Sequence, residues 1–168
     1  LYMAWHMPGR FESGYYACDL LSDVLSRGKS SRLFQTLVKE KQIFSSISSF
    51  VTGTIDPGLF VVSGRLSDGI TPEQGEHEVQ IVLEKLKQEI KEEELTKVKN
   101  QAQSSHVFGE IEVMNRAMNL AFASLSGDAG LVNKEADLIA SVTKEELVSA
   151  AKNILREENC NVLYYLKE

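Results

Sequence analysis

Apolar residues recur at spacings of three and four along most of the chain, which is the period of an amphipathic α-helix. This pattern predicts helices over residues 13–27, 31–41, 71–90, 91–126, 131–140 and 144–155. The fourth of them is expected as one long helix with a bend near Gly109, because no proline interrupts it.

Other regions are rich in β-branched and aromatic residues and predict strands. They cover residues 1–8, the pair 45–54 and 58–66, and residues 159–168. The turn signal Asp56-Pro57-Gly58 predicts that the middle pair forms an antiparallel hairpin. Because the helices gather between widely separated strands, we expect an α+β fold, with a mostly antiparallel sheet and its helices packed on one face.

The predicted helices carry residues that commonly begin or end a helix. Gly28 is expected to end the first helix, and Ser30 or Ser31 to cap the second. Thr71 precedes a glutamine by three residues and Thr143 precedes a glutamate by three, which is the spacing of a capping box.

The composition indicates one soluble domain over residues 1–168. With 168 residues, 43% of them apolar and 25% charged, the chain is long enough for a full hydrophobic core. A net charge of -6 without a basic cluster argues against a nucleic-acid partner. No apolar run approaches the roughly 18 residues that a membrane span needs, and the compartment stays open. Because the chain starts at Leu1, we expect it to be a fragment of a longer protein.

The segment Gly28-Lys29-Ser30-Ser31 looks like the end of a phosphate-binding loop, G-x-x-x-x-G-K-[ST]. Such a loop needs its first glycine five residues before the second, where this chain has Asp23. A glycine that ends one helix, followed by a solvated lysine, explains the same residues. We therefore expect no nucleotide site.

The histidines are too few and too dispersed in sequence for a self-contained zinc site. His77-Glu78 begins like H-E-x-x-H, but the residue four positions after His77 is Ile81, and the inverse order H-x-x-E-H is absent. We expect His77 and His106 at solvent-exposed helix positions, and His6 has no partner nearby in sequence.

The remaining reactive residue types form no catalytic pattern either. The carboxylates 92–94 lie at a predicted helix start, where the helix dipole favours them, and no G-x-S-x-G elbow occurs. Cys18 and Cys160 have no metal-like spacing and are expected as buried apolar side chains, although a disulfide between them is an alternative. Residue types and spacings alone thus predict no catalytic and no metal-binding residue in this chain.

A longer stretch, residues 20–50 with the sequence LLSDVLSRGKSSRLFQTLVKEKQIFSSISSF, resembles a known family. It is similar to the C-terminal domain of the pitrilysin or insulinase family, the inverted-motif zinc metallopeptidases that include the mitochondrial processing peptidase. There a helix of the type LLxxILGxGxSSRLFxxLREKxGLAYSVSA leads into a strand. The matching positions are residues 30–34, Leu37, residues 39–41 and residues 46–48. The lead-in MAWHMPGRFESGYYACDLLSDVL and the later KVKNQAQSSHVFGEIEVMNRAMNLAFASLSGD also resemble family segments, so the similarity covers almost the whole chain.

The resemblance implies the metallohydrolase fold of the processing peptidases and a role beside another domain. In this family the first domain of an active half carries H-x-x-E-H and a distant glutamate, which bind zinc and activate water. This chain would be the second, non-metal domain. Zinc is then expected in the partner domain and not in this segment. Two homologous halves would enclose a chamber that holds the peptide substrate.

One departure from the family concerns substrate contact. Many members supply an arginine and, seven residues later, a tyrosine that reach the bound peptide, and these positions fall on Val38 and Ser45. Valine cannot hydrogen-bond a peptide carbonyl, and serine is too short to replace a phenol. Val38 and Ser45 are therefore expected to face the substrate without supplying the usual pair.

Two functions follow from the resemblance. The chain is expected to be the non-catalytic C-terminal domain of a zinc metallopeptidase, helping to form the chamber next to the zinc-bearing N-terminal domain and a second homologous half. The alternative is a domain of an inactive structural or partner subunit of the same family. The residues leave open whether the parent protein is active.

Overall fold

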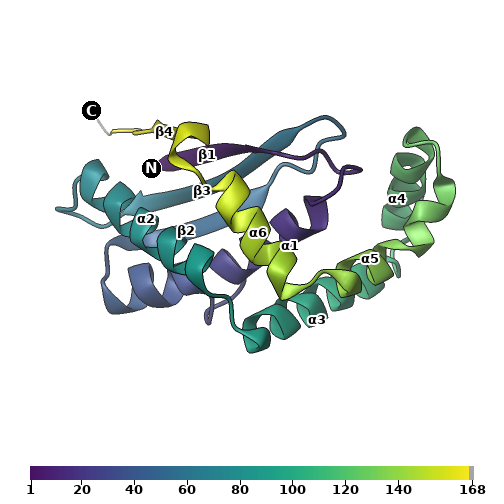
Figure 1. Cartoon of the computed structure of the whole chain (residues 1–168), viewed down its shortest axis with the longest axis horizontal. Helices are drawn as coiled ribbons and strands as arrows, with labels where there is room; N and C mark the ends of the chain where they lie inside the picture. Colours follow the sequence, from purple (N-terminus) through teal and green to yellow (C-terminus); the bar gives the residue numbers. More distant parts are fainter. Residues whose placement is uncertain (167–168) are drawn as a thin grey trace.

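The computed structural model describes residues 1–166, and its centre is one four-stranded sheet (Figure 1). The strand order is β2-β3-β1-β4, and every neighbouring pair is antiparallel. The chain leaves β1 for the helix α1 and returns through the hairpin of β2 and β3, and β4 adds to the free side of β1 at the end. The strands are β1 Tyr2–Met7, β2 Phe44–Val51, β3 Gly58–Leu66 and β4 Cys160–Leu163.

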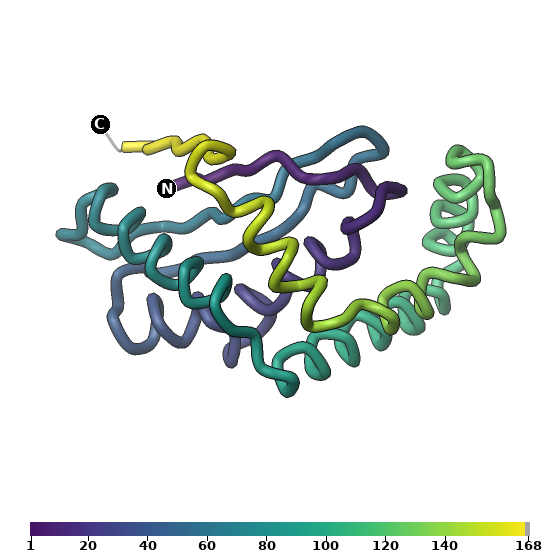
Figure 2. Tube along the Cα trace, in the orientation of Figure 1, coloured from purple at the N-terminus to yellow at the C-terminus, as the bar shows by residue number. Residues whose placement is uncertain are grey.

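The helices lie mostly between β3 and β4 in sequence. Figure 2 traces this path from the hairpin through the helices and back to the sheet. The α-helices are α1 Tyr15–Ser26, α2 Pro72–Gln88, α3 Glu92–Gly109, α4 Val113–Leu125, α5 Glu135–Ser141 and α6 Lys144–Ile154. Shorter helical segments are η1 Phe34–Glu40, η2 Ala129–Asn133 and η3 Glu157–Asn159.

The hydrophobic core lies between one face of the sheet and the helices. Alternate residues of β1, Met3, Trp5 and Met7, are buried, as side chains on one face of a strand must be when helices cover it. They belong to one cluster with residues of α1, α2 and α6, including the fully buried Leu21 and Leu147. Burying each such side chain contributes about 1.5–3 kcal/mol. The sheet and these helices thus form the stable body of the molecule.

The predicted fold class is confirmed: the structure is α+β, with an antiparallel sheet and helices on one face. The predicted hairpin is present, with Ser49 opposite Val62 in its register. Thr71 and Thr143 both form complete capping boxes. Gly28 follows the end of α1 with φ of 81°, the left-handed conformation that glycine adopts at a helix C-terminus.

The prediction of one long helix over residues 91–126 is wrong. The chain forms two helices, α3 and α4, which run in clearly different directions (Figure 1). Asn115 Nδ2 donates to the carbonyl oxygen of Gly109 at 3.3 Å, and Asn119 Nδ2 donates to Glu110 Oε1 at 2.8 Å. Both bonds link α4 back to the end of α3 across the turn at residues 110–112, where the Gly109 carbonyl also accepts from the Glu112 N–H at 3.2 Å instead of from residue 113.

Two smaller predictions also need correction. The second helix is a π-helical segment over most of its length, in which the Lys41 N–H donates to the Thr36 carbonyl oxygen five residues earlier. Ser31 does not cap it, because the Ser31 hydroxyl donates to the Gly28 carbonyl oxygen at 2.7 Å. The final strand covers only Cys160–Leu163, and residues 167 and 168 of the predicted strand lie outside the described residues.

The end of α3, α4 and η2 form a distal arm, residues 107–133, that extends away from the sheet (Figure 1). Only Ala123 of α4 is buried, although the helix is rich in apolar residues. The exposed apolar side chains of the arm include Val107, Phe108, Ile111, Val113, Met114, Met118, Leu120, Phe122 and Leu125.

No helix within residues 1–166 is long and apolar enough to cross a membrane.

Candidate functional site

The two positions predicted to face a substrate lie on consecutive elements but in different surroundings. Val38 is on η1, where it is half-buried and packs against the core. Ser45 is exposed at the start of β2, and its hydroxyl donates to the Arg65 carbonyl oxygen of β3 at 3.1 Å. An irregularity in the pairing between Phe44 and Ser46 places Ser45 at a β-bulge. The Ser45 hydroxyl therefore helps to hold the hairpin together.

The turn between these positions contains a strained residue. Among the described residues other than glycine, Gln42 alone has a positive φ, which is 54°. A side chain in this conformation costs roughly 1–2 kcal/mol, which glycine avoids. The motif that this segment resembles, LREKxGLAYS, has its glycine at the position of Gln42 when Val38 and Ser45 stand at the arginine and the tyrosine. The backbone geometry is thus consistent with that register.

No helix among the described residues covers the second face of the sheet. Its side chains form cross-strand rows: Ser48, Ser63, Tyr2 and Leu163 in one, and Phe50, Val61, Ala4 and Asn161 in the next. Tyr2 and Phe50 are 48% and 47% exposed, and Leu59 and Leu163 are also exposed. We call this surface the open sheet face. It combines exposed apolar side chains with serines, and apolar side chains exposed together over several strands commonly mark a contact surface.

One end of the open sheet face is hollowed. A depression of about 260 Å³ is lined by side chains of Tyr2, Ser46, Ser48, Ser63 and Arg65, together with Ile47 and Gly64. Small serine side chains in three of these positions leave the space, while the longer side chains of Tyr2 and Arg65 border it.

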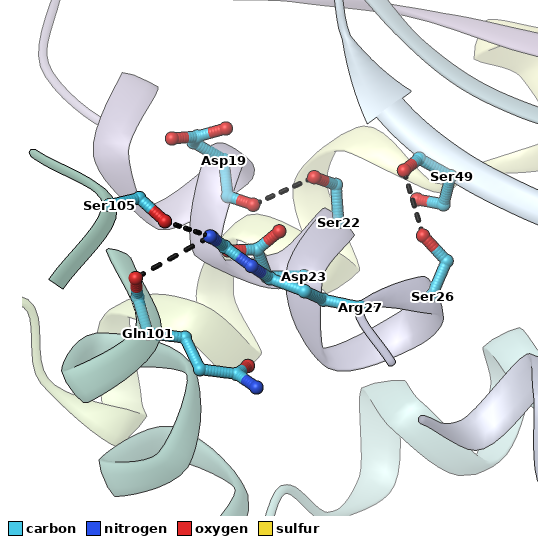
Figure 3. Close-up of polar contacts among 8 residues, drawn as sticks. All are labelled: Asp19, Ser22, Asp23, Ser26, Arg27, Ser49, Gln101 and Ser105. Atoms are coloured by element: carbon cyan, nitrogen blue, oxygen red, sulfur yellow. Dashed lines mark hydrogen bonds and ion pairs between the residues drawn. The ribbon is translucent and has the colours of Figure 1, made fainter. Parts of the chain in front are cut away.

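A second polar cluster lies on the other side of the molecule, where α1 meets α3 (Figure 3). The Arg27 guanidinium is ion-paired with Asp23 at 2.6 Å and donates to Ser105 Oγ at 2.5 Å and to the Gln101 carbonyl oxygen at 3.4 Å. The Ser26 hydroxyl donates to the Ser49 carbonyl oxygen at 2.9 Å. These bonds tie α1 to α3 and to β2.

Among the titratable residues of this cluster, Asp19 has the largest change in pKa. Burial, reinforced by the nearby Asp23 carboxylate, raises the pKa of Asp19 to about 6. Burial also raises the pKa of Asp23, although the Arg27 guanidinium opposes this. A carboxyl group with a pKa near 6 can act in proton transfer. Here, however, the polar groups around it are engaged in bonds between elements, and this supports a structural role for the cluster.

The described residues contain no group of three histidine, cysteine, aspartate or glutamate side chains placed to hold a metal ion. His6, His77 and His106 lie on β1, α2 and α3 respectively. His77 is exposed as predicted, whereas His106 is half-buried, with Nδ1 3.9 Å from Glu135 Oε2.

The remaining candidates from the sequence are also explained by their surroundings. Cys18 is buried, Cys160 is half-buried, and both are free thiols. Burial raises the pKa of Cys18 to about 12 and that of Cys160 to about 11, so both thiols stay protonated at neutral pH. Lys29 is exposed in the turn after Gly28, and Asp23 belongs to α1.

Sequence reasoning missed two features of these sites. Asp23 and Arg27 are four residues apart on one helix, which is a recognisable signal for an ion pair. Arg65 could not be singled out, because the strand pattern does not say which of its two faces lacks a helical cover.

Comparisons with known proteins agree on one family. A family model described as the peptidase M16 inactive domain matches residues 1–102. An uncharacterized zinc protease of Streptomyces coelicolor is 29% identical over 171 residues, which cover 96% of this chain and 36% of that protein. The chain therefore spans about a third of the length of this curated relative.

Solved structures share the fold over nearly the whole chain. The inactive peptidase domain of a proposed zinc protease from Bordetella parapertussis has a TM-score of 0.89 at 22% identity, covering 98% of this chain and 90% of that one. A protease from Helicobacter pylori has a TM-score of 0.88 at 24% identity, covering 95% of this chain and 39% of that one. A chain in complex III2 from Candida albicans has a TM-score of 0.78 at 15% identity, covering 95% of this chain and 40% of that one. Because the family model matches more than half of the chain, the chain belongs to the family of peptidase M16 inactive domains.

Proposed function

We propose that this chain is the non-catalytic domain of a zinc metallopeptidase and forms part of the wall of a peptide-enclosing chamber. The open sheet face is the observation that carries this proposal. One face of the sheet is packed with helices, while the other presents Tyr2, Phe50 and Leu59 beside serines. Apolar side chains exposed over several strands commonly mark a contact surface. In the proposed protein this face borders the bound peptide.

The zinc ion would be held by a separate N-terminal domain. Two observations support this division: the described part of this chain has no cluster of metal-binding side chains, and a zinc protease relative is much longer than the chain. In this arrangement the zinc-bearing domain supplies the Lewis acid and the activated water. The present chain orients the peptide and limits its contact with solvent.

The distal arm is the surface proposed to contact the zinc-bearing domain or a second homologous half. Met114 is 67% exposed and Leu125 is 73% exposed, on a helix with a single buried residue. Leaving such side chains in water forgoes about 25 cal/mol for each square ångström of apolar surface. A partner that covers the arm would recover this free energy.

Val38 and Ser45 are proposed to lie at peptide-facing positions without forming the usual donor pair. Val38 offers only methyl groups, and the Ser45 hydroxyl already donates to Arg65. Peptide binding would therefore depend on other groups of the open sheet face.

The second candidate function is that of a structural or partner subunit without proteolysis. It is supported by the likeness in fold to a chain of complex III2 from Candida albicans, which has a TM-score of 0.78. Both candidates share the same domain and differ in whether the neighbouring domain holds zinc.

Metal analysis and peptide hydrolysis test the proposal. The 168-residue chain should contain no stoichiometric zinc after purification and should cleave no unstructured peptide, because its reactive groups form no metal site. The full-length parent protein, purified in the same way, should contain zinc and cleave the peptide until a chelator removes the metal.

The outcomes separate the candidates. One tightly bound zinc per isolated 168-residue chain would contradict the assignment of the metal to another domain. A parent protein that binds no zinc and cleaves no peptide would instead support the structural-subunit function.

A further inference from the structure

The guanidinium of Arg65 is unusual in this chain because it has no partner within residues 1–166. Arg10, Arg27 and Arg32 are each paired with a carboxylate at 3.0, 2.6 and 2.6 Å. Arg116 lies 3.5 Å from Glu110. By contrast, only the backbone carbonyl of Arg65 is engaged, by Ser45. A free guanidinium presents five donors to whatever binds beside it.

Arg65 borders the depression on the open sheet face, whose floor is polar. It stands opposite Ser46 in the β2–β3 register, and Ser48 and Ser63 form the next cross-strand pair on the same face of the sheet. No hydrogen bond engages the hydroxyls of these three serines within the described residues, whereas the Ser45 hydroxyl is bonded to β3. The depression therefore offers one cation and several uncommitted hydroxyl groups in a space of about 260 Å³.

The position of Arg65 along β3 is fixed by its backbone. Its carbonyl accepts the Ser45 hydrogen bond at the β-bulge, and the same segment pairs with β2. The guanidinium is thus carried by a rigid hairpin, although its own end is free to adapt to a ligand.

A carboxylate fits these groups best. A guanidinium binds a carboxylate through two parallel hydrogen bonds, and serine hydroxyls can donate to the remaining oxygen lone pairs. The whole chain carries a net charge of -6, so acidic peptides are disfavoured over most of its surface. Arg65 is the one lysine or arginine within strands β1 to β4, so on the open sheet face it fixes where an acidic group can bind, and so sets the register of the peptide.

We propose that Arg65, with Ser46, Ser48 and Ser63, forms a binding subsite for the side-chain carboxylate of an acidic residue in an extended peptide. This subsite rests on the proposed role of the open sheet face as a peptide-binding wall, and it adds a preference for glutamate or aspartate at one position of the substrate. Tyr2, at the edge of the depression, packs beside the peptide chain.

Titration of the isotope-labelled 168-residue chain, followed by nuclear magnetic resonance, tests the subsite. The probes are acetyl-Ala-Val-Glu-Val-Ala-amide and its counterpart with glutamine, which differ only in the charged group. The glutamate peptide should shift the amide signals of Ser46, Ser48 and Ser63 and the Arg65 side-chain N–H. It should bind roughly three- to tenfold more tightly than the glutamine peptide, as expected for one partly exposed charge pair.

The variant Arg65→Gln should bind the two peptides equally, and Arg65→Lys should keep part of the preference. Arg156→Gln is the matched control, because Arg156 is also exposed but lies between α6 and η3, outside the strands of the open sheet face, and its guanidinium donates to the Asn153 carbonyl oxygen. This control should retain the full preference. Higher ionic strength should reduce the preference in the unaltered chain.

Equal affinity of the two peptides for the unaltered chain would overturn the subsite, and so would a glutamate preference that survives Arg65→Gln. If both peptides shift the signals of the open sheet face to the same extent, the acid preference fails while the proposed peptide-binding wall stands. If neither peptide shifts them, the peptide-binding wall fails as well.

Discussion

The pKa of Asp19 illustrates how a property of a single residue depends on the packing around it. It lies on α1 next to the ion pair of Asp23 and Arg27, and its own carboxylate makes no hydrogen bond within the described residues. Burial and the Asp23 charge together raise the pKa of Asp19 to about 6. The ordinary value for aspartate is about 3.9. The charged form is therefore less stable in the folded chain than in the unfolded chain.

The replacement Asp19→Asn should stabilise the chain at neutral pH. Above about pH 6 Asp19 is charged in both states, and only the folded state buries that charge. The gain in the free energy of unfolding should be about 1–2 kcal/mol near pH 7.5, after allowance for partial exposure. It should shrink as the pH falls from about 6 to about 4, where Asp19 becomes protonated in both states. Urea unfolding across this pH range measures the difference.

Asp68→Asn serves as the control, because Asp68 is exposed in a turn. This variant should not reproduce the pH-dependent gain. A gain for Asp19→Asn that does not change with pH would show that the burial of charge is not its cause.

At this scale the sequence allowed only part of the site to be predicted. The roles of Val38 and Ser45 came from a family resemblance, and their surroundings became visible only once η1 and the β-bulge were in place. Arg65 and Asp19 could not be singled out, because exposure and burial are set by contacts between elements that are distant in sequence.

Among the elements, α6 shows most directly how local sequence supports the fold. It packs against α1, α2 and β1, and its residues Leu147 and Ala151 are fully buried. Its first turn is closed by the Thr143 hydroxyl, which accepts from the Glu146 N–H at 3.2 Å, while Glu146 Oε2 accepts from the Thr143 N–H at 2.7 Å. The helix is therefore held by a local cap as well as by the core.

Replacing Thr143 by alanine should lower the free energy of unfolding by about 1 kcal/mol, because the Glu146 N–H loses its acceptor. Thr143→Ser keeps the hydroxyl and should cost only a small part of this. Chemical denaturation of both variants checks the difference, and equal stability of the two would contradict a contribution from the cap.

Element types were predicted well where capping and periodicity agreed, as for α2 and α6. A bend near Gly109 was predicted, but the complete separation into α3 and α4 was not, because the apolar spacing continues through Gly109. Hydrogen bonds from the Asn115 and Asn119 side chains back to Gly109 and Glu110 accompany the break. Periodicity of apolar residues carries no information about such bonds.

At the scale of the whole molecule, two surfaces with apolar side chains stay uncovered within the described residues. The open sheet face has no covering layer within the described residues, and the distal arm carries exposed apolar side chains along α4, in which only Ala123 is buried. Arg10 is one link between arm and body, because its guanidinium lies 5.8 Å from the Phe122 ring centroid while it is ion-paired with Glu135 of α5. Both surfaces are those expected of a domain that works inside a larger assembly.

The central claim is that a peptide lies along the open sheet face in the parent protein. Site-specific photo-crosslinking tests it most directly, with p-benzoylphenylalanine placed at Leu59 on the open sheet face or, as a control, at Lys152 on the exposed side of α6. In the full-length protein, an unstructured peptide should be captured from position 59 and not from position 152. Capture from position 152 alone, with none from position 59, would contradict the claim.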